Sequence, residues 1–304
     1  MEGNRSMNFL NKKKVLLRAP VLTQSGYGVH SRQIAQWLLS KSEIDLEIQP
    51  LPWGDTPWLI NSNLHDGLIG KILEKSVDPR GNYDVTVQVQ LPNEWDPSLG
   101  KVNIGVTAGI ETDRCNFSWV SSCNNMNLVI VPSCHSKNSL VSSGNITTPI
   151  EIVPESFSNS ILDTSKRNKI DDLKFSTSFN FLIFGQLTGN NPENDRKNIF
   201  YTVKWLCEVF KDDHDVGIVI KTNSGRNTAI DRKIINQTFN ALVKEVRKSE
   251  YPKLHLIHGD MSDSEIGSLY RHPTIKALVS LTKGEGYGLP ILESASCGLP
   301  VIAT

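Results

Sequence analysis

The sequence has no excess of charge of either sign. Among its 304 residues, 32 Lys and Arg stand against 32 Asp and Glu, so the formal net charge at neutral pH is zero. Proteins that hold DNA or RNA through its phosphates usually carry a basic surplus, which this chain lacks. The charge balance therefore argues against a nucleic-acid partner.

Long apolar runs are also missing. No stretch approaches the ~20 residues that a membrane-spanning helix needs. The charged N-terminal residues are not followed by the apolar run of a signal peptide. We therefore expect a cytoplasmic protein without a transmembrane segment, for which contact with a membrane could only be peripheral.

Cysteine pairs and metal-ligand spacings are absent as well. The five cysteines form no C-x-x-C pair and their number is odd, which is typical of free thiols in a reducing compartment. The histidines and acidic residues do not fall at the spacings of metal ligands. The sequence therefore predicts neither a bound metal nor a cofactor.

What the sequence does contain is a regular alternation of strand and helix patterns. In the first half, strands are expected at residues 14–18, 85–91, 102–107, 128–131 and 150–153. Helices are expected at 29–40 and 133–143, the second closed by Gly144 in the left-handed conformation. After a polar segment at 156–178, strands are expected at 179–184, 216–221, 254–258, 275–281 and 301–303. Helices are expected at 197–210, 229–248, 262–271 and 290–297.

Two such β/α runs are typical of two doubly wound α/β domains. We predict an N-terminal Rossmann-like domain at residues 1–155, an interdomain linker at 156–178 and a second Rossmann-like domain at 179–304. Ligands of such sheets bind beyond the carboxyl ends of the strands, so a site is expected in the cleft where the two domains face each other. Because the sequence stops inside a strand, we expect the second domain to be incomplete and the chain to be C-terminally truncated.

The last 22 residues, KGEGYGLPILESASCGLPVIAT, carry the strongest signal. Three glycines at 284, 286 and 288 allow the backbone to approach a ligand closely. Pro290 then begins a helix, whose exposed N–H groups and dipole favour an anion such as a diphosphate. Glu293 is expected in the first helical turn, where its carboxylate could accept hydrogen bonds from a vicinal diol. Glu285 lies in the glycine loop and could accept from sugar hydroxyls.

Each of these features alone has an ordinary structural explanation, a tight turn or a carboxylate that complements the helix dipole. Together, in the frame E-G-Y-G-L-P-x-x-E followed by C-G-x-P-V-I-A-T, they resemble the signature of glycosyltransferase family 4. That family consists of retaining, metal-independent enzymes with the GT-B fold, which use a nucleotide-diphosphate sugar as co-substrate. The resemblance implies a hexosyltransferase-like enzyme with an N-terminal domain on the acceptor side and a C-terminal domain that binds the nucleotide sugar.

The resemblance also implies roles for individual residues. Glu285 would contact the transferred sugar as a catalytic residue, and Glu293 would bind the ribose. Backbone amides would hold the sugar and phosphates of the donor; they belong to Gly286, Tyr287, Gly288 and Leu289.

The second domain offers three possible cationic contacts to the diphosphate. Family members commonly have an arginine where this chain has Gln186, which removes one positive charge. The later lysine of the family matches Lys197, with Arg196 beside it as a substitute. A cationic pair at a helix start is unfavourable unless an anion binds there. Lys221, at the end of a strand, is either a second phosphate contact or a lysine that reaches solvent.

In the first domain, Ser25-Gly26-Tyr27-Gly28 resembles the family's glycine loop, and Gly26 and Gly28 are assigned to the donor site. Glu111 follows the strand at 102–107 and is the candidate for acceptor binding, although a turn role is also open. Many relatives have a histidine near this region that touches the sugar, but none is assigned here. His30 and His135 are expected on helix surfaces.

The predicted function is a retaining transfer of a sugar to the hydroxyl of an unknown acceptor, which could be a glycan, a lipid or a small molecule. Two alternatives remain. Gln186 and the unassigned histidine leave open a catalytically inactive nucleotide-sugar-binding protein. A phage-type glycosyltransferase acting on DNA is disfavoured by the zero net charge.

Overall fold

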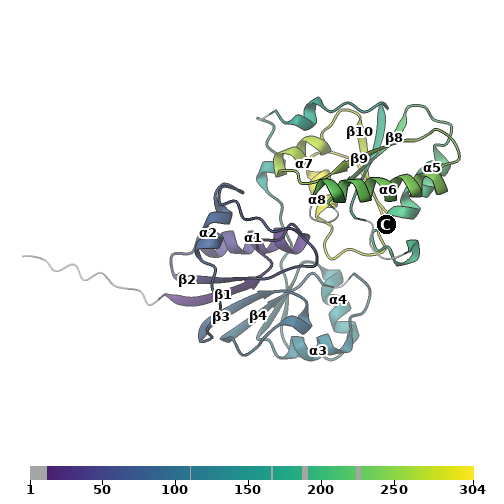
Figure 1. The fold of residues 1–304 in the computed structure, drawn as a ribbon. Helices are drawn as coiled ribbons and strands as arrows, with labels where there is room; N and C mark the ends of the chain where they lie inside the picture. The colour runs from purple at the N-terminus through teal and green to yellow at the C-terminus, as the bar shows by residue number, and fades with distance from the viewer. Residues whose placement is uncertain (1–11, 110, 166, 187–190, 224–226) are drawn as a thin grey trace, which may run out of the picture. The chain divides into compact units, whose positions relative to one another are not determined.

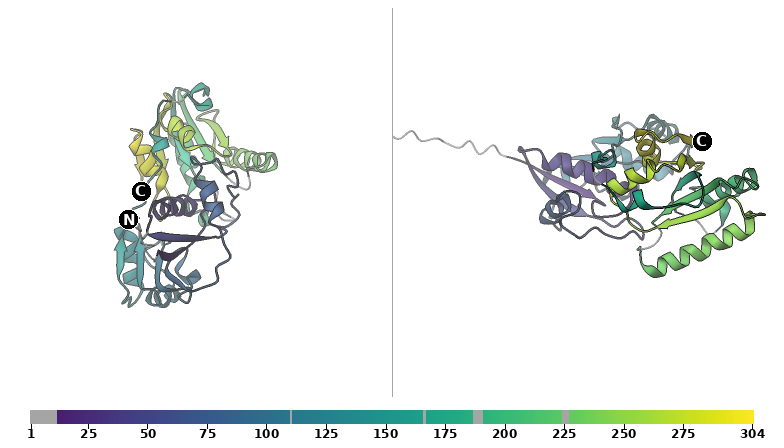
Figure 2. Two further views of the ribbon diagram at one scale, coloured as in Figure 1. Left: turned by 90° about the vertical axis from the view of Figure 1, so that its left-hand side faces the viewer. Right: turned by 90° about the horizontal axis from the view of Figure 1, so that it is seen from above.

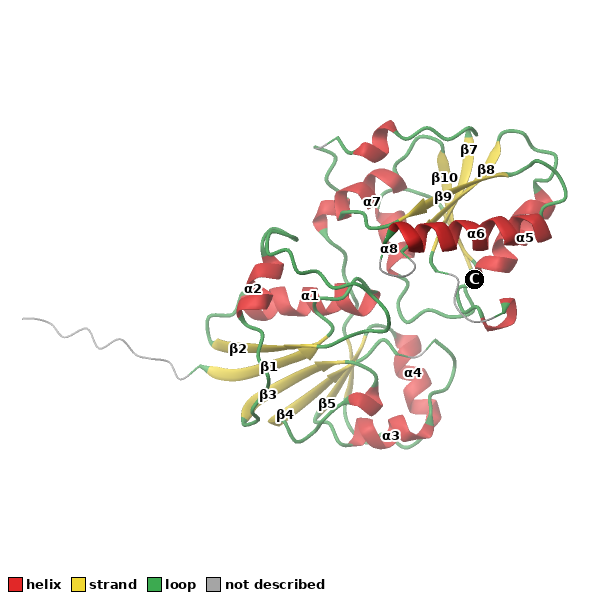
Figure 3. Cartoon of the chain, viewed as in Figure 1, coloured by secondary structure: helices red, strands yellow, loops and turns green. Residues whose placement is uncertain are grey.

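The computed structural model describes residues 12–109, 111–165, 167–186, 191–223 and 227–304. The chain divides into two compact units, Met1–Glu155 and Ser156–Thr304 (Figures 1 and 3). Each unit is built around a parallel sheet with helices on both faces, in agreement with the predicted fold class.

The sheet of the first unit has strand order β2-β1-β3-β4-β5-β6, with every neighbouring pair parallel. Its strands are β1 (Lys13–Ala19), β2 (Ile44–Pro50), β3 (Tyr83–Val89), β4 (Gly100–Val106), β5 (Leu128–Val131) and β6 (Ile150–Ile152). Its helices are α1 (Gly26–Leu39), α2 (Leu68–Glu74), α3 (Phe117–Asn124) and α4 (Cys134–Ser143). Apolar residues 15–17 of β1 are at most 4% exposed, as expected for a strand covered on both faces.

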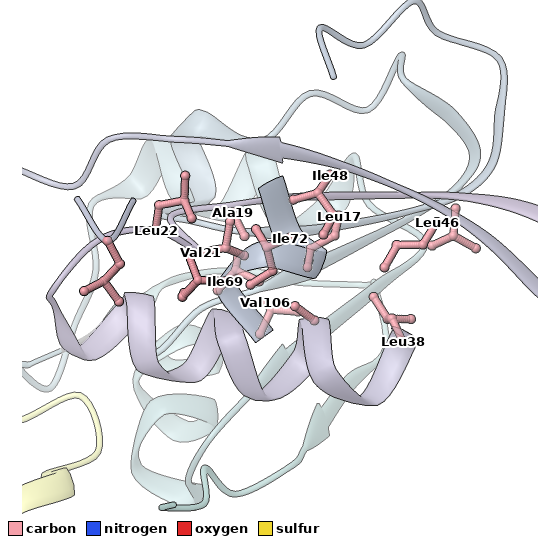
Figure 4. Close-up of a cluster of buried hydrophobic side chains, with 14 residues drawn as sticks. Leu17, Ala19, Val21, Leu22, Leu38, Leu46, Ile48, Ile69, Ile72 and Val106 are labelled. Atoms are coloured by element: carbon pink, nitrogen blue, oxygen red, sulfur yellow. The ribbon is translucent and has the colours of Figure 1, made fainter. Parts of the chain in front are cut away.

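The larger core of this unit lies between the sheet and helices α1 and α2 (Figure 4). Leu17, Ile48, Ile69 and Ile72 are fully buried there, and Leu38 of α1 is 3% exposed. A second core forms against α3 and α4, around Cys123 and Leu140. Because both faces are covered, the polar groups that can meet a ligand are left to the loops at the strand ends.

Several local predictions for this unit need correction. Strand β2 and helices α2 and α3 were not predicted, and α1 begins at Gly26, three residues before the expected start. Gly144 follows α4 with φ 167° and ψ −177°, which is extended backbone. The predicted left-handed stop at Gly144 is therefore wrong. His30, expected on a helix surface, is buried with 7% exposure.

The sheet of the second unit has strand order β11-β10-β7-β8-β9, and all its pairs are parallel. Its strands are β7 (Phe179–Phe184), β8 (Val216–Thr222), β9 (Lys253–His258), β10 (Ile275–Ser280) and β11 (Val301–Ala303). Its helices are α5 (Ile199–Val209), α6 (Ala229–Val246), α7 (Asp263–Tyr270) and α8 (Leu289–Ser296). One core packs under α5 and α6 and the other under α7 and α8 (Figure 2).

The segment 156–178, expected as a linker, lies within the second unit and packs on α7. Ile161 is 2% exposed, and its carbonyl oxygen accepts a hydrogen bond from Arg271 Nη1 at 2.8 Å. The backbone passes so close to α7 that a Cβ on Gly267 would lie 2.0 Å from the same oxygen. The polar composition of this segment suggested a linker. Its few apolar residues pack into the core under α7 and α8 and so anchor the segment to the second unit.

The two glycines in the first turn of α1, Gly26 and Gly28, differ in how much space they leave for a side chain. A Cβ on Gly28 would lie 2.1 Å from the carbonyl oxygen of Thr23, whereas a Cβ on Gly26 would meet nothing within 4 Å. Since the obstacle is backbone, we expect Gly28→Ala to lower the free energy of unfolding by ~1–3 kcal/mol. Gly26→Ala, the matched control in the same turn, should be neutral or stabilise by up to ~1 kcal/mol. Urea unfolding of both variants measures the difference, and equal midpoints would contradict this account of the loop.

Candidate functional site

The predicted glycine loop of the second unit connects β10 to α8. Gly288 is the N-cap residue of α8 and has φ 86°, a left-handed conformation that strains any residue with a side chain. The loop is also tied to the chain before α5. The Lys283 N–H donates to Arg196 O at 2.9 Å, and Thr282 Oγ1 donates to the same carbonyl at 3.1 Å. These bonds hold residues 282–288 beside residues 195–198.

Glu285, Lys197 and Arg196 meet at this junction. Lys197 Nζ lies 2.5 Å from Glu285 Oε1, and Arg196 Nη1 lies 3.4 Å from Glu285 Oε2. Arg196 Nη1 also donates to Gly284 O at 2.9 Å. The Lys197 and Glu285 side chains are each 19% exposed, so the pair is partly shielded from water. Glu285, predicted as a sugar contact, and the predicted diphosphate contacts Lys197 and Arg196 thus form one charged cluster.

Lys197 is fixed by the turn that precedes α5. Asn198, the N-cap residue, is left-handed with φ 55°, and its Nδ2 donates to Leu281 O at 2.8 Å. The buried Asp195 carboxylate accepts from the Ile199 N–H at 2.6 Å. Helix α5 therefore begins at Ile199, two residues after the predicted start at Lys197. The two cations precede the helix, where Asp195 already complements its dipole.

A small pocket opens beside this cluster. It is lined by residues from β7, the turn before α5, β10, the glycine loop and the start of α8: Phe184, Lys197, Leu278, Ser280, Glu285, Gly288, Pro290 and Ile291. The pocket thus has apolar side chains, the Lys197 ammonium, the Glu285 carboxylate and the first turn of α8 in its lining. Of the predicted donor residues, Lys197, Glu285 and Gly288 line it directly.

Glu293 occupies a different environment from the predicted one. It is the fifth residue of α8 and so lies beyond the first turn. Its carboxylate Oε2 accepts a hydrogen bond from the Tyr270 hydroxyl of α7 at 2.9 Å. Burial raises the pKa of Glu293 to about 7, with the Tyr270 hydrogen bond opposing the shift. Glu293 is not among the residues that line the pocket.

Lys221 is 1% exposed, which contradicts the alternative that it reaches solvent. Its ammonium donates to Gly259 O at 2.7 Å and to Asn223 Oδ1. Burial lowers the pKa of Lys221 to about 8. Gln186, which stands where the family commonly has arginine, donates from Nε2 to Asn223 O at 2.9 Å. Asn223 thus contacts both Lys221 and Gln186.

In the first unit, the Ser25-Gly26-Tyr27-Gly28 turn is organised by contacts that sequence reasoning missed. Ser25 caps α1 by accepting from the Gly28 N–H at 3.0 Å. The Tyr27 ring stacks on Trp53 with 3.8 Å between centroids. The Tyr27 hydroxyl lies 3.0 Å from Thr107 Oγ1 and accepts from the Ala108 N–H at 3.1 Å. The loop is therefore joined to the strand end that precedes Glu111.

Glu111 itself is partly buried. Burial raises the pKa of Tyr27, and the charges of Glu155 and Glu111 act on it in the same direction. A buried pair that was not predicted lies nearby, with His30 Nδ1 3.6 Å from Glu155 Oε1. Burial lowers the pKa of His30 to about 4 and raises the pKa of Glu155 to about 7. At neutral pH the imidazole is uncharged, so this contact is not an ion pair despite its short distance.

The described residues include no cluster of three potential metal ligands. None of the helices in the described parts of the chain has the length and apolar content needed to cross a membrane.

Comparison with known families identifies the C-terminal segment. Residues 234–304, from α6 to β11, match the family described as "Glycosyl transferases group 1". This match confirms the resemblance predicted from the two glutamates. No curated protein sequence matches the chain significantly.

Comparison with solved structures identifies the fold. Sucrose-phosphate synthase (tll1590) from Thermosynechococcus elongatus aligns with TM-score 0.59 at 12% identity, covering 96% of this chain and 81% of that one. Anabaena Alr3699/HepE in complex with UDP and glucose aligns with TM-score 0.59 at 14% identity, covering 96% and 80%. An E. coli trehalose-6-phosphate structure bound with UDP-2-fluoro glucose aligns with TM-score 0.57 at 9% identity, covering 95% and 83%. At these identities the likeness establishes the fold, which is GT-B-like.

The buried carboxyl group of Glu293 predicts a pH-dependent stability. Its pKa is raised in the folded state, so the unfolded chain releases the proton first and stability falls as pH rises from ~4.5 to ~7. Glu293→Gln cannot ionise, and we expect it to be more stable relative to the native chain at about pH 8 than at about pH 5. Urea midpoints at the two pH values measure this change.

Glu155 has a similarly raised pKa, so Glu155→Gln should remove a separate part of the decrease in stability with rising pH. The exposed Glu151→Gln serves as the control and should leave the slope unchanged. If Glu293→Gln follows the native pH profile in parallel, the carboxyl group does not ionise in this window.

Proposed function

Since residues 234–304 carry the group 1 glycosyl transferase domain on a GT-B-like fold, we propose that this chain is a retaining glycosyltransferase. It transfers a sugar from a nucleotide-diphosphate donor to a hydroxyl group of an acceptor. The observation that carries the proposal is the cluster of Glu285, Lys197 and Arg196 beside the glycine loop and the first turn of α8.

The proposed donor is a UDP-hexose. The structures with similar folds include one described with UDP and glucose, one with UDP-glucose and one with UDP-2-fluoro glucose. The small pocket beside Lys197 offers what a sugar diphosphate needs at its charged end, which is a cation and the N-terminus of a helix. In this proposal Gly286, Tyr287, Gly288 and Leu289 supply backbone contacts to the donor.

The ion pair suggests how binding of the donor reorganises the site. In the structure, the single carboxylate of Glu285 pairs with both Lys197 and Arg196, so the three side chains together keep an excess of positive charge. A diphosphate carries more charge than one carboxylate and draws both cations toward it. Glu285 then becomes an acceptor for the sugar hydroxyls, which it orients. Arg196 substitutes for the positive charge that Gln186 does not provide.

Glu293 and Lys221 have supporting roles in this proposal. Glu293 accepts from the ribose hydroxyls while Tyr270 fixes its orientation through the 2.9 Å hydrogen bond. A bound diol favours the ionised carboxylate and so lowers its pKa from about 7. Lys221 can act as a second phosphate contact only by leaving Gly259 O and Asn223, which hold its ammonium.

The chemical step follows from stabilising the departing diphosphate. Cations and amides act most strongly where negative charge develops as the bond to the sugar breaks. An oxygen of the diphosphate takes the proton of the incoming hydroxyl on the same face of the sugar, so configuration at the anomeric carbon is retained. Glu285 forms no covalent bond to the sugar. Glu111 is proposed to contact the acceptor.

A second candidate is a protein that binds nucleotide sugar without turnover. The observation that favours it is Gln186, which is neutral and already bonded to Asn223 O. Release of UDP from UDP-glucose in the presence of an acceptor separates the two, because a binding protein retains the intact donor.

Lys197 provides the sharpest test of the diphosphate site. We expect Lys197→Ala to weaken UDP binding by ~10–100-fold, since it removes a charge-assisted hydrogen bond to the phosphates and the closer of the two cations that pair with Glu285. Uridine, which has no phosphate, should bind almost unchanged. The control is Lys276→Ala, an exposed lysine at the opposite end of β10. Calorimetric titration measures all four affinities, and equal losses for UDP and uridine would contradict a phosphate contact.

Glu285 tests the catalytic step separately. We expect Glu285→Gln to reduce turnover by at least ~100-fold, because the sugar loses its orienting carboxylate. UDP affinity should not fall, since the variant releases Lys197 and Arg196 from their ion pair. Proton NMR of the native product gives its anomeric configuration, which we expect to match that of the donor. An inverted product, or a sugar trapped as an ester on Glu285, would overturn the mechanism.

A further inference from the structure

The first unit contains a second hollow, which the sequence did not indicate. It lies at the carboxyl ends of β1, β2 and β3, and its volume is about 330 Å³. Its lining includes Arg18 from β1, Trp53 from the loop after β2, and Gln90 and Glu94 after β3. Ligand pockets of proteins commonly have volumes of ~300–1,000 Å³, so a monosaccharide derivative fits this space. The carboxyl edge of a parallel sheet is also where ligands of such folds bind.

The charge of Arg18 has no carboxylate partner in the hollow. Nε donates to Gln49 Oε1 at 3.1 Å, and Nη1 donates to Gln90 Oε1 at 2.6 Å and to Glu94 O at 2.7 Å. Nη1 also makes a longer contact of 3.5 Å to Gln88 Oε1, and all four acceptors are neutral. Among the described residues, no carboxylate oxygen lies within the 4.0 Å of an ion pair with this guanidinium, and Nη2 makes no recorded hydrogen bond.

The nearest acidic side chains are engaged elsewhere. Glu94 Oε2 accepts from the Leu91 N–H at 3.1 Å, and Asp96 Oδ1 accepts from the Ser98 N–H at 2.9 Å. Both carboxylates act on Arg18 only at a distance, and burial remains the dominant influence, which lowers its pKa. A partly buried guanidinium without a close counterion favours an oxyanion as its partner, because a planar fork of donors matches carboxylate and phosphate.

The position of Arg18 is set by the register of the sheet. Arg18 pairs with Gln49 on β2 and with Gln88 on β3, so amide side chains flank it on both sides. Gln88 is fully buried and is itself bonded to the backbone of Asp96. The guanidinium is therefore held in one orientation before any ligand binds, which reduces the entropy lost on binding.

Trp53 supplies an apolar wall to the same hollow. Its indole stacks on Tyr27 with an interplanar angle of 19°, and Tyr27 is fixed through its hydroxyl by Thr107 and Ala108. A rigid aromatic face beside a cation and an amide suits a sugar ring, which presents apolar C–H groups on its faces and hydroxyls at its edge.

We propose that this hollow binds the acceptor of the reaction proposed above, and that the acceptor is a sugar carrying an oxyanion, either a phosphate or a carboxylate. The inference rests on the proposed function. Arg18 binds the oxyanion, Trp53 stacks on the sugar ring, and Gln90 positions Arg18. The hollow then determines acceptor specificity, because a neutral sugar leaves the Arg18 charge unpaired.

The test is calorimetric titration of the full chain with three probes: glucose 6-phosphate, glucuronate and glucose. Saturating UDP is present throughout, so that the diphosphate site is occupied. We expect at least one anionic sugar to bind more than ~10-fold tighter than glucose, which corresponds to one charge-assisted contact. The preferred anion distinguishes phosphate from carboxylate.

Variants assign the preference to this hollow. Arg18→Gln should abolish the advantage of the anionic sugar, and Arg18→Lys should retain only part of it. Arg80→Gln is the matched control, since Arg80 is exposed and precedes β3 at the opposite edge of the sheet. Trp53→Leu should weaken the binding of all three sugars by similar factors. Thermal melting of each variant checks that it folds. If Arg18→Gln does not fold, the preference of the native chain for anionic sugars over glucose remains the test of the proposal.

Equal binding of glucose and the anionic sugars, no saturable binding at millimolar concentration, or an unchanged preference in Arg18→Gln would each overturn the proposal. A chain that binds UDP without any preference for anionic sugars refutes the acceptor inference and leaves the proposed function standing. A chain that prefers the anionic sugar yet binds no UDP supports the hollow and refutes the proposed function.

Discussion

The parallel pairing of both sheets is the constraint on which the rest of the structure depends. A parallel sheet must be covered on both faces, since each crossover places a helix over it. The middle of such a strand then becomes apolar, as in residues 15–17 of β1 and 218–220 of β8, all of which are buried. Polar chemistry is left to the loops at the strand ends. Arg18, Lys221 and Glu285 all lie at or just beyond the carboxyl end of a strand.

These polar groups are partly or fully buried, so each depends on a close partner to offset its loss of hydration. Glu285 and Lys197 neutralise each other at 2.5 Å, and removal of either leaves a partly desolvated charge without its partner. Glu293 avoids that cost by a raised pKa and a hydrogen bond from Tyr270. The Arg18 guanidinium donates its hydrogen bonds to neutral acceptors, with the Glu94 and Asp96 carboxylates acting on it only at a distance. In the proposals above, Lys197 exchanges the Glu285 carboxylate for a diphosphate, and Arg18 accepts an oxyanion.

The sequence predicts the fold class and the glycine loop because both depend on local patterns. Alternating strands and helices, and glycines at fixed spacing beside Glu285, are readable along the chain. Glu293 was expected in the first turn of a helix starting at Pro290, but α8 starts one residue earlier, at Leu289, and Glu293 is its fifth residue. The Glu293 carboxyl group meets Tyr270, 23 residues away, which no local pattern predicts. The stacking of Tyr27 on Trp53 and the amides around Arg18 were not predictable. They join residues 26 to 72 positions apart, and only strand order and register bring them together.

The central claim is that the glycine loop, Lys197 and Glu293 form the binding site for a nucleotide sugar. A crystal structure of the full chain with UDP-glucose tests it most directly. We expect the diphosphate within hydrogen-bond distance of Lys197 Nζ and the first amides of α8, with Lys197 displaced from Glu285 and the ribose hydroxyls on Glu293. Nucleotide bound elsewhere, with the Glu285–Lys197 ion pair intact, would contradict the account.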